Sequence, residues 1–115
     1  MPYRGACHCG AVTFEVDDSP KWLVTCTCSV CRRTGALWFH TAPDRVTVSG
    51  ETDGYVWGDE MLSFRRCKTC GCLTHYTPLD GAERMAVNMR MADPSEIAGI
   101  RVRQFDGADS WAFLD

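Results

Sequence analysis

The sequence lacks an apolar run of about 18 residues, the minimum for a membrane-spanning helix, so we expect no membrane partner. It also lacks a basic excess, because 12 Lys and Arg residues stand against 15 Asp and Glu residues and give a formal charge of −3. A phosphate backbone binds best to clustered Lys and Arg side chains, so this negative net charge disfavours nucleic acid as a partner. The first five residues lack the apolar core of a secretory signal, and we therefore expect a cytoplasmic, reducing setting.

Signals for long helices are also scarce. One short helix is expected at 29–34, stopped by Gly35, and another after Asp93, whose side chain can cap a turn that begins with Pro94. Short β-branched and aromatic stretches between turn residues predict strands at 11–16, 22–25, 37–41, 46–48, 55–57, 61–65, 73–77, 84–91 and 100–105. The 115 residues match the common size of one domain, so we predict a single, mainly β domain over 1–115, built from small antiparallel sheets.

Cysteine, by contrast, is abundant. The eight cysteines form three tight clusters: Cys7 and Cys9; Cys26, Cys28 and Cys31; Cys67, Cys70 and Cys72. Cysteines one or two residues apart rarely reach the Cα separation that a disulfide requires, but they can present thiolates to a shared zinc ion. The clusters therefore predict metal sites.

Ligand counting separates two centres. Cys7, Cys9, Cys67 and Cys70 form two well-separated pairs, each followed by a glycine that tolerates positive φ and lets backbone amides turn toward the sulfurs. We predict that these four hold a closed, structural zinc.

The cluster of Cys26, Cys28 and Cys31 supplies only three thiolates. An open fourth position is typical of a catalytic zinc, where water or a substrate sulfur can bind. Cys72 remains unassigned: it is either an extra ligand that closes the second centre or a buried free thiol.

The order of these motifs resembles the glutathione-dependent formaldehyde-activating enzyme family, which also includes centromere protein V. The matching pieces are CxCG at 7–10, CxCxxC at 26–31, CxxCG at 67–71 and a late Asp-Gly followed by Trp within 105–111. The resemblance covers essentially the whole chain. Cys72 departs from the pattern, since Thr or Ser is expected at that position.

The resemblance implies an Mss4-like fold, in which several small coiled sheets surround a structural zinc. It also implies a second zinc on Cys26, Cys28 and Cys31, hence two zinc ions per chain. The family's named activity joins formaldehyde to glutathione and yields S-hydroxymethylglutathione, formally a carbon-sulfur lyase reaction in reverse. A small thiol such as glutathione and a small aldehyde are thus the expected partners.

An anionic tripeptide thiol needs cationic contacts, and Arg32 and Arg33 directly follow the third cysteine of the open cluster. Either can form charge-assisted bonds to a carboxylate, although both also suit a solvated helix face. His40 is a proton carrier only if its strand borders the open centre.

Two other functions fit the same residues. The protein could be a non-catalytic, zinc-stabilised binding module in which Cys72 or a histidine closes the second centre. It could also be a redox enzyme of the methionine sulfoxide reductase type, in which an exposed cysteine acts as nucleophile rather than ligand.

Overall fold

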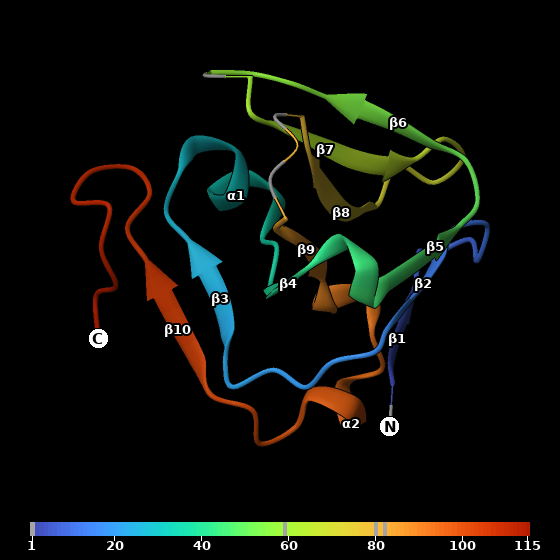
Figure 1. Ribbon diagram of the computed structural model, residues 1–115, viewed down its shortest axis with the longest axis horizontal. Coiled ribbons are helices and arrows are strands. Elements are labelled where there is room, and N and C mark those ends of the chain that lie inside the picture. The colour runs from blue at the N-terminus through green and yellow to red at the C-terminus, as the bar shows by residue number, and fades with distance from the viewer. Residues whose placement is uncertain (1, 59, 80, 82) are drawn as a thin grey trace.

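The computed structural model describes residues 2–58, 60–79, 81 and 83–115, whose strands form two sheets (Figure 1). The smaller sheet has the order β1-β2-β5, with bounds Tyr3–Ala6, Thr13–Val16 and Val46–Ser49. The larger has the order β10-β3-β4-β9-β8-β7-β6, with bounds Val102–Phe105, Leu23–Cys26, Trp38–Thr41, Met85–Asn88, Leu73–Pro78, Leu62–Cys67 and Thr52–Tyr55. The predicted mainly β class with little helix is confirmed.

Alternation in the sequence explains which strand faces are buried. In β2, Phe14 and Val16 are buried while Thr13 and Glu15 are exposed, as expected for a strand with one wet face. Strand β9, by contrast, is buried along its whole length at the centre of the larger sheet. The main core lies between the two sheets, where Phe14 from β2 joins the same buried cluster as Phe39 from β4.

Both short helices form as predicted. Helix α1 spans Ser29–Thr34 and ends at Gly35, whose φ of 67° requires a residue that tolerates the left-handed conformation. Helix α2 spans Pro94–Ile97, and the Asp93 side chain accepts a hydrogen bond from the Ser95 amide at its start. Two single 3-10 turns lie at Pro43–Arg45 and Met89–Met91. Among the described residues, no helix is long and apolar enough to cross a membrane.

Three strand predictions were wrong in detail. Strand β1 was not expected, because Tyr3–Ala6 is too short to show a pattern. Strand β6 spans Thr52–Tyr55, whereas the strand was expected at 55–57. The strand expected at 84–91 ends at Asn88, because the side chain of Asn88 accepts hydrogen bonds from the amides of Arg90 and Leu37 and diverts the chain.

The sheets are also not wholly antiparallel. Strand β10 runs parallel to β3, with Phe105 opposite Cys26. Parallel neighbours end at the same edge of a sheet, so the segments that follow β3 and β10 emerge side by side. In Figure 1 this edge lies at the upper left, where α1 follows β3 and the red C-terminal loop follows β10.

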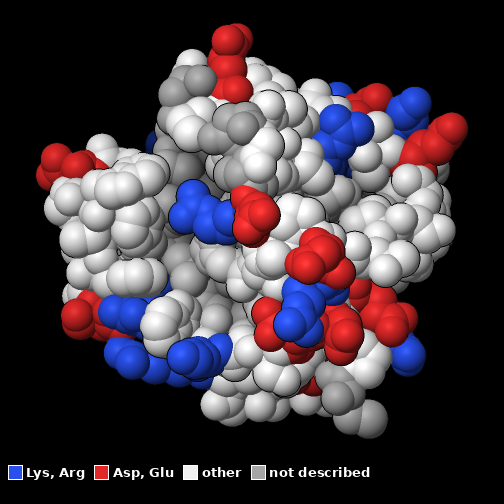
Figure 2. Space-filling view, viewed as in Figure 1, with Lys and Arg blue, Asp and Glu red and all other residues white. Residues whose placement is uncertain are grey.

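Charged side chains are mixed over the surface. Figure 2 shows acidic and basic groups interspersed on this face, separated by neutral surface, rather than one extended basic patch.

Candidate metal centres

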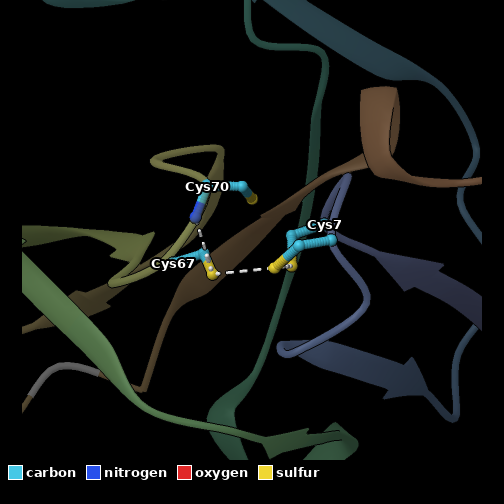
Figure 3. A group of neighbouring side chains, drawn as sticks. Cys7, Cys67 and Cys70 are labelled. Carbon is cyan, nitrogen blue, oxygen red and sulfur yellow. Dashed lines mark hydrogen bonds between the residues drawn. The ribbon is translucent and has the colours of Figure 1, made fainter.

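The first centre joins two hairpin loops that are distant in sequence. The sulfur atoms of Cys7, Cys9, Cys67 and Cys70 all lie within 4.8 Å of one another. Cys9 Sγ is 3.6 Å from both Cys7 Sγ and Cys67 Sγ. Four sulfur ligands at about 2.3 Å from a zinc ion lie about 3.8 Å apart, so this set fits tetrahedral zinc. Figure 3 shows Cys67, at the end of β7, and Cys70, on the loop that follows, opposite Cys7 on the N-terminal segment.

The two loops share one backbone design. The amide of Cys7 donates to Val12 O and that of Cys67 donates to Cys72 O, so each loop is closed five residues after its first cysteine. Gly10 and Gly71 adopt φ of 81° and 78°, and their amides donate to the carbonyls of Cys7 and Cys67. Both glycines thus have the positive φ that the sequence analysis expected them to tolerate.

Backbone amides stabilise negative charge on these sulfurs. Val12 N donates to Cys7 Sγ at 3.2 Å, and the amides of Thr69 and Cys70 donate to Cys67 Sγ at 3.3 and 3.5 Å. A hydrogen bond from the Cys72 amide, aided by that of Cys9, lowers the pKa of Cys70 to about 5. Thiolates held by N–H donors are the form in which cysteine binds metal.

Cys72 lies at the first centre and not at the second. It packs with Cys7, Val12 and Cys67, and it takes the place in its loop that Val12 takes in the other. Although the His8 amide favours its thiolate, burial and a hydrogen bond with Cys70 leave the pKa of the Cys72 thiol raised. Cys72 therefore does not close the Cys26, Cys28 and Cys31 group.

The second centre is assembled where β3 passes into α1. Cys26 ends β3, Cys28 caps α1 and Cys31 lies inside the helix, and their three sulfurs are within 4.8 Å of one another. No fourth His, Cys, Asp or Glu side chain of the described part of the chain joins this group. Three sulfurs on one side fit a zinc ion with one position left for another ligand.

Nearby donors favour the thiolate form here as well. Trp38 Nε1 donates to Cys31 Sγ at 3.3 Å, and Cys31 N donates to Cys28 Sγ at 3.4 Å. A hydrogen bond with Cys31, together with the amides of Cys28 and Gly107, lowers the pKa of Cys26 to about 5. Cys31 shares this hydrogen bond and is buried, so its own pKa is raised.

The C-terminal loop that follows β10 covers this centre. Thr27, between two of the cysteines, donates from Oγ1 to Asp106 Oδ1 at 2.6 Å and accepts from the Ala108 amide at 3.2 Å. Ser110 donates to the other oxygen of Asp106 from both its amide and its hydroxyl. Gly107 packs so closely that a Cβ there would lie 2.7 Å from Cys26 Sγ.

A groove of about 260 Å³ borders the second centre. Its lining residues come from β3, α1 and the segments beside them: Thr25, Cys26, Thr27, Cys31, Arg32, Gly35, Ala36, Arg90 and Gln104. Arg33, expected beside Arg32 as a substrate contact, lies outside this lining. Its Nη1 donates to the Ser29 carbonyl of its own helix, because a side chain one position further around α1 faces another way.

A family model described as glutathione-dependent formaldehyde-activating enzyme matches residues 2–105. The chain belongs to this family. The crystal structure of a Rhodobacter sphaeroides protein, a Northeast Structural Genomics target, is similar with a TM-score of 0.72 and 29% sequence identity. The match covers 86% of this chain and 98% of that one. Membership confirms the Mss4-like fold that the motifs imply.

Sequence reasoning missed several groups around the second centre of this family member. Arg90 and Gln104 line the groove, yet both were expected within strands and neither stands near a cysteine in sequence. The sequence also gave no signal that the indole N–H of Trp38 donates to Cys31 Sγ. The late Asp-Gly motif was the available signal for the loop at Asp106, but the motif did not indicate contact with Thr27 or Cys26. His40 is exposed on β4 and is not among the groove residues.

Proposed function

We propose that this protein is a zinc-dependent enzyme of the carbon-sulfur lyase type that joins a small thiol to formaldehyde. Glutathione is the candidate thiol and S-hydroxymethylglutathione the candidate product. Family membership supports the reaction class. The observation that carries the proposal for this chain is a group of three cysteine sulfurs, without a fourth ligand among the described residues, that borders a groove.

Two zinc ions are proposed, with different roles. Cys7, Cys9, Cys67 and Cys70 would hold a structural ion, and Cys26, Cys28 and Cys31 would hold a second. When bound, the second zinc would supply an open coordination position that lowers the pKa of a substrate thiol. A cytoplasmic, reducing setting suits this chemistry, because metal binding needs cysteines that are not oxidised to disulfides, and none of the eight forms one.

The reaction needs no oxidant or reductant. The thiol loses its proton, its sulfur forms a bond to the formaldehyde carbon as the carbonyl π bond breaks, and the oxygen takes up one proton. Thiols already add to formaldehyde without a catalyst, so the protein has to position the two molecules and favour the thiolate. The expected acceleration is correspondingly modest.

The groove is suited to the thiol end of a peptide. Its volume of about 260 Å³ is below the range of about 300–1,000 Å³ that encloses a drug-sized ligand, so part of a tripeptide would remain on the surface. Cys26 and Cys31 lie in the lining, which brings the substrate sulfur to the open side of the group. Arg32 lines the same groove and would bind a carboxylate.

NMR exchange spectroscopy tests the reaction. The rate of exchange between formaldehyde, glutathione and their adduct is measured with and without protein. The wild type should accelerate the exchange, and so should Cys72→Ser, the matched control outside the second centre. With Cys28→Ser the exchange should proceed only at the uncatalysed rate. An unchanged rate with zinc-loaded wild-type protein would refute the enzyme, and X-ray absorption that shows four protein ligands at the second zinc would refute the open site.

A further inference from the structure

We propose that Arg90 makes the groove selective for thiols that carry a carboxylate over neutral thiols. The inference rests on the proposed function, because it names the substrate class of that same site. It assigns a substrate-binding role to a residue that stands 59 positions from the nearest cysteine of the second centre in sequence but lines the same groove.

The backbone of Arg90 is fixed by a buried side chain. Asn88, which is only 3% exposed, accepts hydrogen bonds at Oδ1 from Arg90 N at 3.1 Å and from Leu37 N at 3.0 Å. Its Nδ2 donates to Leu73 O at 2.9 Å. The buried amide thereby joins β8, β9 and the residue before β4 at one point, and Arg90, two residues further on, lines the groove.

One hydrogen bond at Nε also orients the guanidinium group of Arg90. Arg90 Nε donates to the Gly35 carbonyl at 3.2 Å, at the end of α1. Within the described residues, neither Nη group has a hydrogen-bond partner and no carboxylate pairs with this arginine. An arginine held at Nε presents its two Nη groups in a planar arrangement that matches a carboxylate.

The charges around the groove favour an anion. Its lining contains two guanidinium groups, from Arg32 and Arg90, and no Asp or Glu, although acidic residues outnumber basic ones in the chain as a whole. Three thiolates with one zinc ion would carry a net negative charge. A negatively charged substrate would be repelled there unless cations stood beside the sulfur, which is where these two arginines lie.

A purely structural role for Arg90 makes different predictions. The bond to Gly35 O satisfies a carbonyl near the C-terminus of α1, and α1 carries Cys31. If capping were the whole role, loss of the guanidinium would lower zinc occupancy and slow the reaction of every thiol by the same factor.

The test compares Arg90→Gln with Arg33→Gln, which removes the same charge outside the groove, and with Arg90→Lys, which keeps it. Exchange rates are measured with glutathione and with 2-mercaptoethanol, and zinc content is measured for each variant. Binding of S-methylglutathione, which has the carboxylates but no free thiol, is followed by NMR titration. We expect Arg90→Gln to raise KM for glutathione and Kd for S-methylglutathione about tenfold, with kcat and the 2-mercaptoethanol rate within twofold of wild type. Arg33→Gln should match wild type, and Arg90→Lys should recover part of the loss.

Equal losses for both thiols, or no loss for either, would overturn the role of Arg90. The titration distinguishes failure of the carboxylate site from failure of the proposed enzyme activity. If the wild type accelerates no thiol reaction, the proposed function fails. The proposed carboxylate site is supported if Arg90→Gln weakens S-methylglutathione binding. It is refuted if binding is absent or is unaffected by Arg90→Gln.

Discussion

Replacing Gly107 with alanine should release zinc from the second centre while the four-cysteine centre stays loaded. A Cβ at position 107 would lie 2.7 Å from Cys26 Sγ and 3.3 Å from Cys28 Cβ. Gly107 does not have a positive φ, so the expected effect is steric and does not come from backbone strain. The new methyl group must push either the loop or a metal-binding sulfur out of place.

The cost can be bounded from the contacts. An added methyl group in a filled space costs about 1–3 kcal/mol when its neighbours must move. Asp106 and Ala108 of the loop are both hydrogen-bonded to Thr27, so the loop cannot move away from the centre without breaking these bonds. Disturbing groups that orient metal ligands lowers metal affinity by roughly 10–100-fold. We expect zinc affinity at the second centre to fall within this range.

Zinc content after dialysis and the rate of zinc transfer to a chromophoric chelator measure the effect. Wild-type protein should release two zinc ions per chain in two phases, and Gly107→Ala should lose or accelerate the phase from the second centre alone. Gly99→Ala is the control: its φ of 83° makes alanine strained, but no atom lies within 4 Å of the added Cβ. It should lower stability without changing zinc release.

Two results would refute this reasoning. If Gly107→Ala retains both zinc ions and releases them at the wild-type rates, the loop does not support the second centre. If the Gly99→Ala control loses zinc to the same extent, zinc loss follows from general destabilisation and says nothing about contact with Cys26.

Two further predictions concern buried groups of the larger sheet. Trp38→Phe removes the N–H that donates to Cys31 Sγ at 3.3 Å, so zinc release from the second centre should become about tenfold faster, and unchanged chelator kinetics would contradict this. Burial, aided by the charge of Arg65, lowers the pKa of His75 from 6.5 to about 4, so the unfolded chain binds a proton that the folded protein excludes. Stability from this group is complete above pH 6.5 and is lost as the pH falls toward 4, by roughly 2 kcal/mol at pH 5. Urea unfolding at pH 7 and pH 5 should show a smaller decrease in the free energy of unfolding for His75→Gln than for wild type. Zinc loss in acid affects both proteins alike. Equal decreases in the two proteins would contradict the role given to His75.

The sequence predicted best what local chemistry decides. The two glycines with positive φ, the caps of α1 and α2 and the three-cysteine group follow from spacing within a few residues, while the four-cysteine group was predicted by counting ligands. The parallel pairing of β10 with β3 could not be predicted, because strand length and alternation do not specify a partner. That pairing is what brings Asp106 and Gly107 to Thr27 and Cys26. The position of Arg90 was missed for the same kind of reason, since it depends on the turn that Asn88 imposes after β9.

The different roles proposed for the two centres agree with where each centre lies in the fold. The four-cysteine centre joins the β1–β2 loop of the smaller sheet to the β7–β8 loop of the larger, so a zinc ion there would link the two sheets. Structural zinc contributes on the order of 10 kcal/mol or more to folding, and losing it would separate these loops. The three-cysteine centre lies at the edge of the larger sheet alone, where β3, α1 and the C-terminal loop already meet through hydrogen bonds. A zinc ion there could therefore exchange a ligand at its open position without separating the sheets, which is the property that the proposed thiol chemistry requires.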